Sequence, residues 1–134
     1  MTSFRVDRPG VDNLFDRAIV KASTATVATT TTITAAQVRA FAASGIMIGT
    51  LSGAQTITFP TAALMVAAFP GVDVNDLLVL RVMNGADNTL TLASGSGGTD
   101  VGTLTVGAGI ISTFVVRFTN VTAASEAYSL ILQI

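Results

Sequence analysis

From Ile46 to its end, the chain alternates short runs of β-forming residues with turns, and this alternation limits the fold more than any other feature. Runs such as IMIGTL, TITF, LLVLRVMN and TLTLAS are separated by SGAQ, GADN and glycine-rich segments. Short strands with turns at intervals of about eight to twelve residues are typical of sandwiches and barrels. We therefore predict an all-β fold, a single β-sandwich or jelly-roll-like domain. No internal repeat is convincing, which disfavours a solenoid.

Three further features of the strands are predicted. The runs Leu77–Asn84 and Thr89–Ser94 flank GADN and predict a hairpin. The segment GSGGTDVG, residues 95–102, is predicted to be a loop. The run IISTFVVRFT, residues 110–119, is the longest strand candidate.

Alternation in the last two strand candidates predicts which faces form the core. The core faces carry Ile110, Phe114, Val116, Phe118, Tyr128, Leu130, Leu132 and Ile134. The opposite faces carry Ile111, Val115 and Ile131 beside Thr113, Arg117 and Gln133. Such a half-apolar outer face fits burial between subunits.

The segment FPTAALMVAAFPG predicts a short helix. Thr61 is a good N-cap, Pro70 stops a helix, and Gly71 suits the left-handed conformation that follows many helices. A membrane-spanning helix needs about 20 apolar residues, more than Pro60 and Pro70 leave between them. The segment therefore packs within the domain or on a neighbouring chain.

A second short helix is predicted upstream in TAAQVRAFAASG. Thr34 and Gln37 have the spacing of a capping box, and Gly45 can end the helix. The preceding STATVATTTTIT, Ser23–Thr34, fits either an extended strand or a low-complexity linker. The chain thus divides into an N-terminal arm (1–22), a Thr-rich segment with a helix (23–45) and a β domain (46–134).

Charge is scarce and unevenly placed. Charged residues make up 11% of the chain, against about 25% in an average soluble domain. Seven of the fifteen charged side chains lie within the first 21 residues, and the net charge is −1. The electrostatic field of such a chain is too weak to steer it toward nucleic acid or an anionic membrane. Weak repulsion between copies favours a protein that is part of an assembly.

Two residue types common in catalytic sites are missing from the sequence, although paired carboxylates remain formally possible. The chain has neither histidine nor cysteine, which excludes Ser-His-Asp and Cys-His arrangements. Asp73 and Asp76 in GVDVND are interpreted as turn residues that cap backbone donors. The glycine-rich segments lack the strand–loop–helix context of a phosphate site, and the calcium-loop patterns are broken. We therefore expect no enzyme, with no catalytic residue, metal site or cofactor.

The N-terminal arm, SFRVDRPGVDNLFDRAIVK, mixes large apolar residues with charges of both signs. One interpretation is a solvated, disordered terminus. The other is an arm that becomes ordered on a partner, with aromatic and arginine side chains at the interface. The candidate partner-binding residues are Phe4, Arg5, Arg8, Leu14, Phe15 and Arg17.

The run TITFPTAALMVAAFPGVDVNDLLVLRVMNGADNTLTLASGSG, continued by VGTLTVGAG and FVVRFTNVTAASEAYSL, resembles a domain of virion proteins of tailed bacteriophages. The similarity covers about residues 55–134. Members of this kind look like capsid decoration, or cement, proteins. The resemblance implies a structural homotrimer on the capsid surface, bound at junctions between major capsid protein subunits. Localisation would be the virion, after synthesis in the host cytoplasm, because MTSFRVDRPG lacks the pattern of a secretory signal.

The alternative is a small tail fibre, spike or head–tail component that binds a host receptor or another virion protein. Aromatic side chains on distal loops would favour it, but the chain has one tyrosine and no tryptophan. The copy number in the virion separates the two hypotheses.

Overall fold

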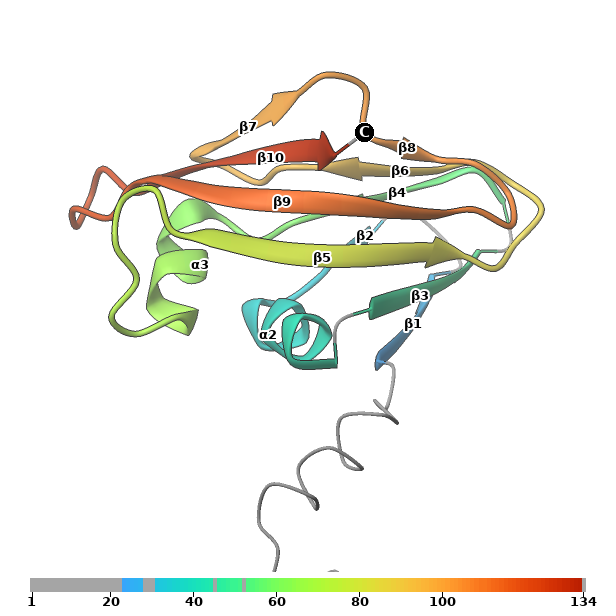
Figure 1. Cartoon of the computed structure of the whole chain (residues 1–134), viewed down its shortest axis with the longest axis horizontal. Helices are drawn as coiled ribbons and strands as arrows, with labels where there is room; N and C mark the ends of the chain where they lie inside the picture. The colour runs from blue at the N-terminus through green and yellow to red at the C-terminus, as the bar shows by residue number, and fades with distance from the viewer. Residues whose placement is uncertain (1–22, 28–30, 45, 52, 134) are drawn as a thin grey trace, which may run out of the picture.

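The computed structural model describes residues 23–27, 31–44, 46–51 and 53–133, which form two mixed sheets and two helices (Figure 1). The six-stranded sheet has the order β1 (Ser23–Val27), β3 (Ile46–Leu51), β5 (Leu77–Asn84), β9 (Ile111–Asn120), β10 (Ala127–Gln133) and β7 (Gly98–Val101). The four-stranded sheet has the order β2 (Thr31–Thr32), β4 (Gln55–Thr58), β6 (Leu90–Ala93) and β8 (Thr105–Val106). The helices are α2 (Ala35–Ser44) and α3 (Ala62–Ala68).

The first six strands alternate between the two sheets. As a result β1, β3 and β5 are parallel to one another, and so are β2, β4 and β6. Parallel neighbours need a crossover, and the passages through α2 and α3 supply one before β3 and one before β5. This winding resembles the turns of a short solenoid, although the sequence has no repeat to predict it. A jelly roll, by contrast, is built from antiparallel strands.

The predicted hairpin of residues 77–84 and 89–94 is wrong, because β5 and β6 belong to different sheets. Asn84, the last residue of β5, is fully buried. Its Nδ2 donates to the carbonyl oxygens of Asn88 and, at 3.0 Å, Val106, while its Oδ1 accepts from Ala86 N at 3.1 Å. These bonds turn the chain out of the first sheet toward the second.

The predicted loop of residues 95–102 contains a strand, β7, which pairs in parallel with β10. Three of its glycines, Gly95, Gly97 and Gly98, pack closely against other segments. A Cβ on Gly95 would lie 2.4 Å from the carbonyl oxygen of Phe59, and a Cβ on Gly98 would lie 2.7 Å from Tyr128 Cζ. Glycine occurs here because other segments pack closely against the backbone. A sequence pattern alone does not distinguish such glycines from those of a flexible loop.

Both predicted helices are confirmed, with their N-terminal caps, while the predicted helix end at Gly45 lies outside the described residues. Thr61 Oγ1 accepts from Leu64 N at 3.3 Å, and Gly71 has a φ of 83°. At α2, Thr34 N donates to Gln37 Oε1 at 2.8 Å, and Gln37 N donates to Thr34 Oγ1 at 3.1 Å. Neither α2 nor α3 has the length and apolar character that crossing a membrane requires.

Buried side chains from both sheets and both helices form one core cluster. The predicted core residues of β9 and β10 are buried in it: Phe114, Val116, Phe118, Tyr128 and Leu130. Leu132 packs against the cluster as a partly buried residue. Ile110 was predicted in the core but is 51% exposed, because it lies in the turn before β9. Ile134 lies outside the described residues.

Candidate interaction surface

An apolar row crosses the outer face of the six-stranded sheet. Val79 of β5 lies opposite Val115 of β9, which lies opposite Ile131 of β10, and Ile131 pairs with Val101 of β7. Val79 is 53% exposed and Val101 46% exposed. Four β-branched side chains thus stand next to one another on four adjacent strands, the outer two exposed and Val115 and Ile131 half-buried.

More apolar area flanks this row. Leu77 is 61% exposed, and Ile111, at 55%, lies opposite the half-buried Met83. The charged side chains of β5 and β9 are both cations, Arg81 and Arg117. Neighbouring apolar side chains exposed on one face are a feature of contact surfaces.

Arg117 is held in place at one end of the face. Its Nε and Nη2 donate to Asn75 Oδ1 at 3.0 and 2.7 Å. Asn75 has a φ of 73°, and its N–H donates to the carbonyl oxygen of Phe118 at 2.7 Å. The connection between α3 and β5 is therefore fastened to β9, which fixes the rim of the apolar face.

The outer face of the four-stranded sheet is chemically different. Thr56 of β4 pairs with Thr91 of β6, which pairs with Thr105 of β8, and Thr32 of β2 pairs with Thr58. Their neighbours Ile57, Leu90, Leu92 and Val106 point into the core. As far as the structure describes the two sheets, only the six-stranded one thus has an apolar row on its outer face. Polar side chains flank that row, Arg81, Thr113 and Gln133 on one side and Arg117 and Ser129 on the other.

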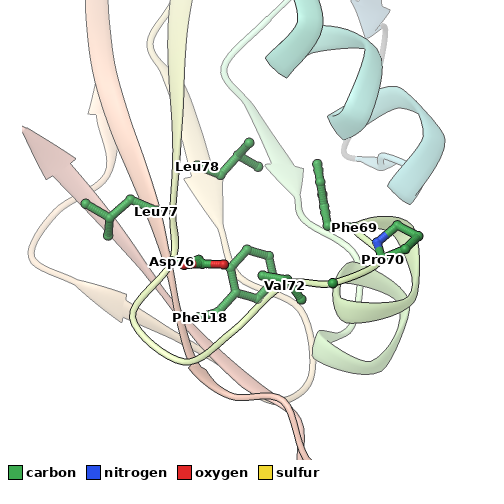
Figure 2. A pocket seen from close by; sticks show the side chains of 8 residues that line it. Phe69, Pro70, Val72, Asp76, Leu77, Leu78 and Phe118 are labelled. Atoms are coloured by element: carbon green, nitrogen blue, oxygen red, sulfur yellow. The ribbon is translucent and has the colours of Figure 1, made fainter.

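A pocket of about 310 Å³ opens beside the start of β5 (Figure 2). It is lined by Phe69, Pro70, Gly71, Val72, Asp76, Leu77, Leu78 and Phe118. The rings of Phe69 and Phe118 meet edge to face, with centroids 6.1 Å apart. Figure 2 shows the side chain of Leu77 pointing away from Phe69 and Pro70, so its backbone rather than its side chain borders the pocket on that side.

The acidic turn beside this pocket is a capping turn, as the sequence predicted. Asp73 N donates to Asp76 Oδ2 at 2.8 Å, and Asp76 N donates to the carbonyl oxygen of Asp73 at 3.1 Å. No cluster of three or more potential metal-ligating side chains occurs in the part of the chain that the structure describes.

Tyr128 of β10 joins two segments that lie far from it in the sequence. Its hydroxyl donates to the carbonyl oxygen of Pro60 at 2.8 Å and accepts from Gly95 N at 2.9 Å. Burial, partly offset by the Gly95 hydrogen bond, raises the pKa of Tyr128 to about 12. The N–H of Gly95 donates to this hydroxyl. The N–H of Gly98 donates to the carbonyl oxygen of Gly95. The glycine-rich segment is thus a packing element with two of its donors already engaged.

The candidate partner-binding residues of the arm, Phe4, Arg5, Arg8, Leu14, Phe15 and Arg17, lie outside the described residues. The outer-face residues Ile111, Val115 and Ile131 were predicted from alternation, and the structure places them on one face. Val79 and Val101 were missed because their place in the row depends on the order of the strands. Comparison with known proteins finds no family model that matches the chain, no similar curated protein and no similar solved structure.

Proposed function

We propose that this chain is a structural virion protein that binds and stabilises a phage capsid as a homotrimeric decoration protein. The observation that carries the proposal is the exposed apolar row of Val79, Val115, Ile131 and Val101. The partners would be the major capsid protein and other copies of the chain. The two sheets would form a β-sandwich that presents this row to them.

The energetics of the row favour assembly. Burial of apolar area contributes about 25 cal/mol per Å², without any need for charge complementarity. A trimer repeats each contact, so that modest affinities multiply through effective concentration. Contacts that exist only on the assembled shell stabilise that shell by mass action. A protein of this kind performs no chemistry.

The resemblance of residues 55–134 to decoration proteins supports the same role. Its motif includes the TITFP strand end and the glycine-rich segment, which Tyr128 joins, and also residues of β5 and β9. Val79 and Val115 of the apolar row therefore lie within the segments that carry the resemblance.

Protein stoichiometry in purified virions tests the proposal. A copy number comparable with that of the major capsid protein supports decoration. A few copies per particle would instead favour the fibre or head–tail alternative. Deleting residues 2–22 tests the arm separately: we expect a folded trimer that no longer decorates, and full occupancy by the truncated chain would exclude the arm as the capsid contact.

A further inference from the structure

The pocket at the start of β5 combines apolar walls with an acidic rim. Phe69, Val72 and Leu78 supply apolar walls, and Asp76 lies among the lining residues. Asp73 sits in the same turn, bonded to Asp76 through its N–H. Arg117 reaches this turn through Asn75 Oδ1. An occupant that fits would carry a large apolar side chain with a cation close by in sequence.

The N-terminal arm contains such a segment, LFDR, residues 14–17. The chain has seven phenylalanines, and the five in the described residues, Phe41, Phe59, Phe69, Phe114 and Phe118, belong to the core or pack against it. The two others, Phe4 and Phe15, both lie in the arm. The arm has four basic and three acidic residues up to Lys21, whereas the rest of the chain has three basic and five acidic ones, so the opposite net charges favour contact.

The register of the strands sets the distance from the end of the arm to the pocket. Ser23 starts β1 and pairs with Met47 of β3, which pairs with Val82 of β5. The arm therefore joins the fold level with Val82, five residues beyond Leu77, where β5 begins. At about 4.8 Å per strand and 3.3 Å per residue, Ser23 and Leu78 are roughly 16 Å apart. The eight residues from Phe15 to Ser23 span up to about 27 Å.

We propose that this pocket receives the side chain of Phe15 from the chain's own N-terminal arm, with Arg17 beside Asp73 and Asp76. Phe15 is preferred to Phe4 because the shorter connection loses less entropy on closure. Docking of Phe15 leaves residues 1–13, with Phe4, Arg5 and Arg8, to reach a partner. The proposal does not depend on the virion function, because it concerns the isolated chain.

Disulfide trapping in the full-length chain tests this placement, and the absence of native cysteine leaves no background. The pair Leu14→Cys and Val74→Cys puts one thiol next to Phe15 and the other in the turn beside the pocket, at a side chain that is 49% exposed. A disulfide needs the two Cα atoms within about 7 Å. We expect an intrachain disulfide, identified by mass spectrometry. The pair Leu14→Cys and Asp87→Cys, at the other end of β5, is the control and should remain reduced.

Two further variants separate docking of Phe15 from chance encounters. In the Leu14→Cys, Val74→Cys background, Phe15→Ala should slow disulfide formation at least about tenfold, and Phe4→Ala should leave the rate unchanged. Equal rates in the Phe15→Ala and parent chains would overturn the proposal. So would disulfides between chains, or an equally fast reaction with Asp87→Cys.

Discussion

The hydroxyl of Tyr128 donates a hydrogen bond to the carbonyl oxygen of Pro60, 2.8 Å away and 68 positions earlier in the chain. The same hydroxyl accepts from Gly95 N at 2.9 Å. One side chain of β10 therefore joins the residue before the N-cap of α3 to the segment that follows β6. Because Tyr128 is only 1% exposed, water does not replace these bonds when they are lost.

Tyr128→Phe should destabilise the fold. The substitution keeps the ring but leaves the Pro60 carbonyl and the Gly95 N–H without this partner, at a cost of about 1 to 3 kcal/mol. Urea unfolding measures the change. Ser129→Ala, one residue away on the half-buried outer face, is the control and should change the free energy of unfolding by less than about 0.5 kcal/mol. Equal effects of the two substitutions would contradict this role of the hydroxyl.

The stability of the protein should fall at alkaline pH. The folded pKa of Tyr128 is raised to about 12 from 10.0, so the folded state keeps a proton that the unfolded state releases. The stabilisation is complete below pH 10 and is lost as the pH rises from there toward 12, by at most about 1.4 kcal/mol per pH unit. As the chain has one tyrosine, ultraviolet titration follows this group alone. Titration near pH 10 in the folded protein would refute the account.

Gly95→Ala should be far more damaging than Gly102→Ala. A Cβ at position 95 would lie 2.4 and 2.6 Å from the backbone oxygen atoms of Phe59 and Pro60. Backbone atoms cannot move aside as easily as the end of a flexible side chain can. We expect a loss of roughly 3 kcal/mol or more. Gly102 has a φ of 79° with open space around it, so alanine there adds only backbone strain, about 1 to 2 kcal/mol. Thermal unfolding of both variants should show this order, and the reverse order would contradict the packing.

Asn84→Asp should strongly destabilise the protein, although the two side chains have nearly the same shape. A carboxylate has no N–H for the Val106 and Asn88 carbonyls, and burying its charge beside them costs about 3 kcal/mol or more. Asn120→Asp is the matched control, because its Oδ1 only accepts, from Thr122 N at 2.9 Å, and a carboxylate can do the same. Similar urea midpoints for both variants would show that Asn84 does not hold the crossover.

Local signals in the sequence predicted both helices, since the caps at Thr34 and Thr61 lie within three residues of the groups they satisfy. Alternation likewise predicted the faces of β9 and β10. Strand pairing was harder. The segment after Asn84 looks like a hairpin turn, yet a buried amide bonded 22 positions away sends the chain to the other sheet. No pattern in the sequence near Asn84 predicts that its side chain will bond to Val106.

The candidate surface was only partly predicted, because strand pairing could not be predicted from local sequence. Residues on one strand share a face by alternation alone, which was enough for Val115 and Ile131. A row across strands also needs the strand order, and the parallel pairing of β7 with β10 arises in a segment whose glycines resemble a loop. Val101 can therefore be assigned to the row only once the order of the strands is known.

The most direct test of the account compares charged substitutions on the two outer faces, with particle occupancy as the measurement. Val115→Glu puts a carboxylate in the centre of the apolar row, and Thr56→Glu puts one on the threonine face. Both side chains are half-buried, so the two chains should fold alike. We predict that Val115→Glu lowers the copy number on purified capsids at least about tenfold, whereas Thr56→Glu retains it. Full occupancy by the Val115→Glu chain would contradict the proposal that this face binds the capsid or neighbouring copies.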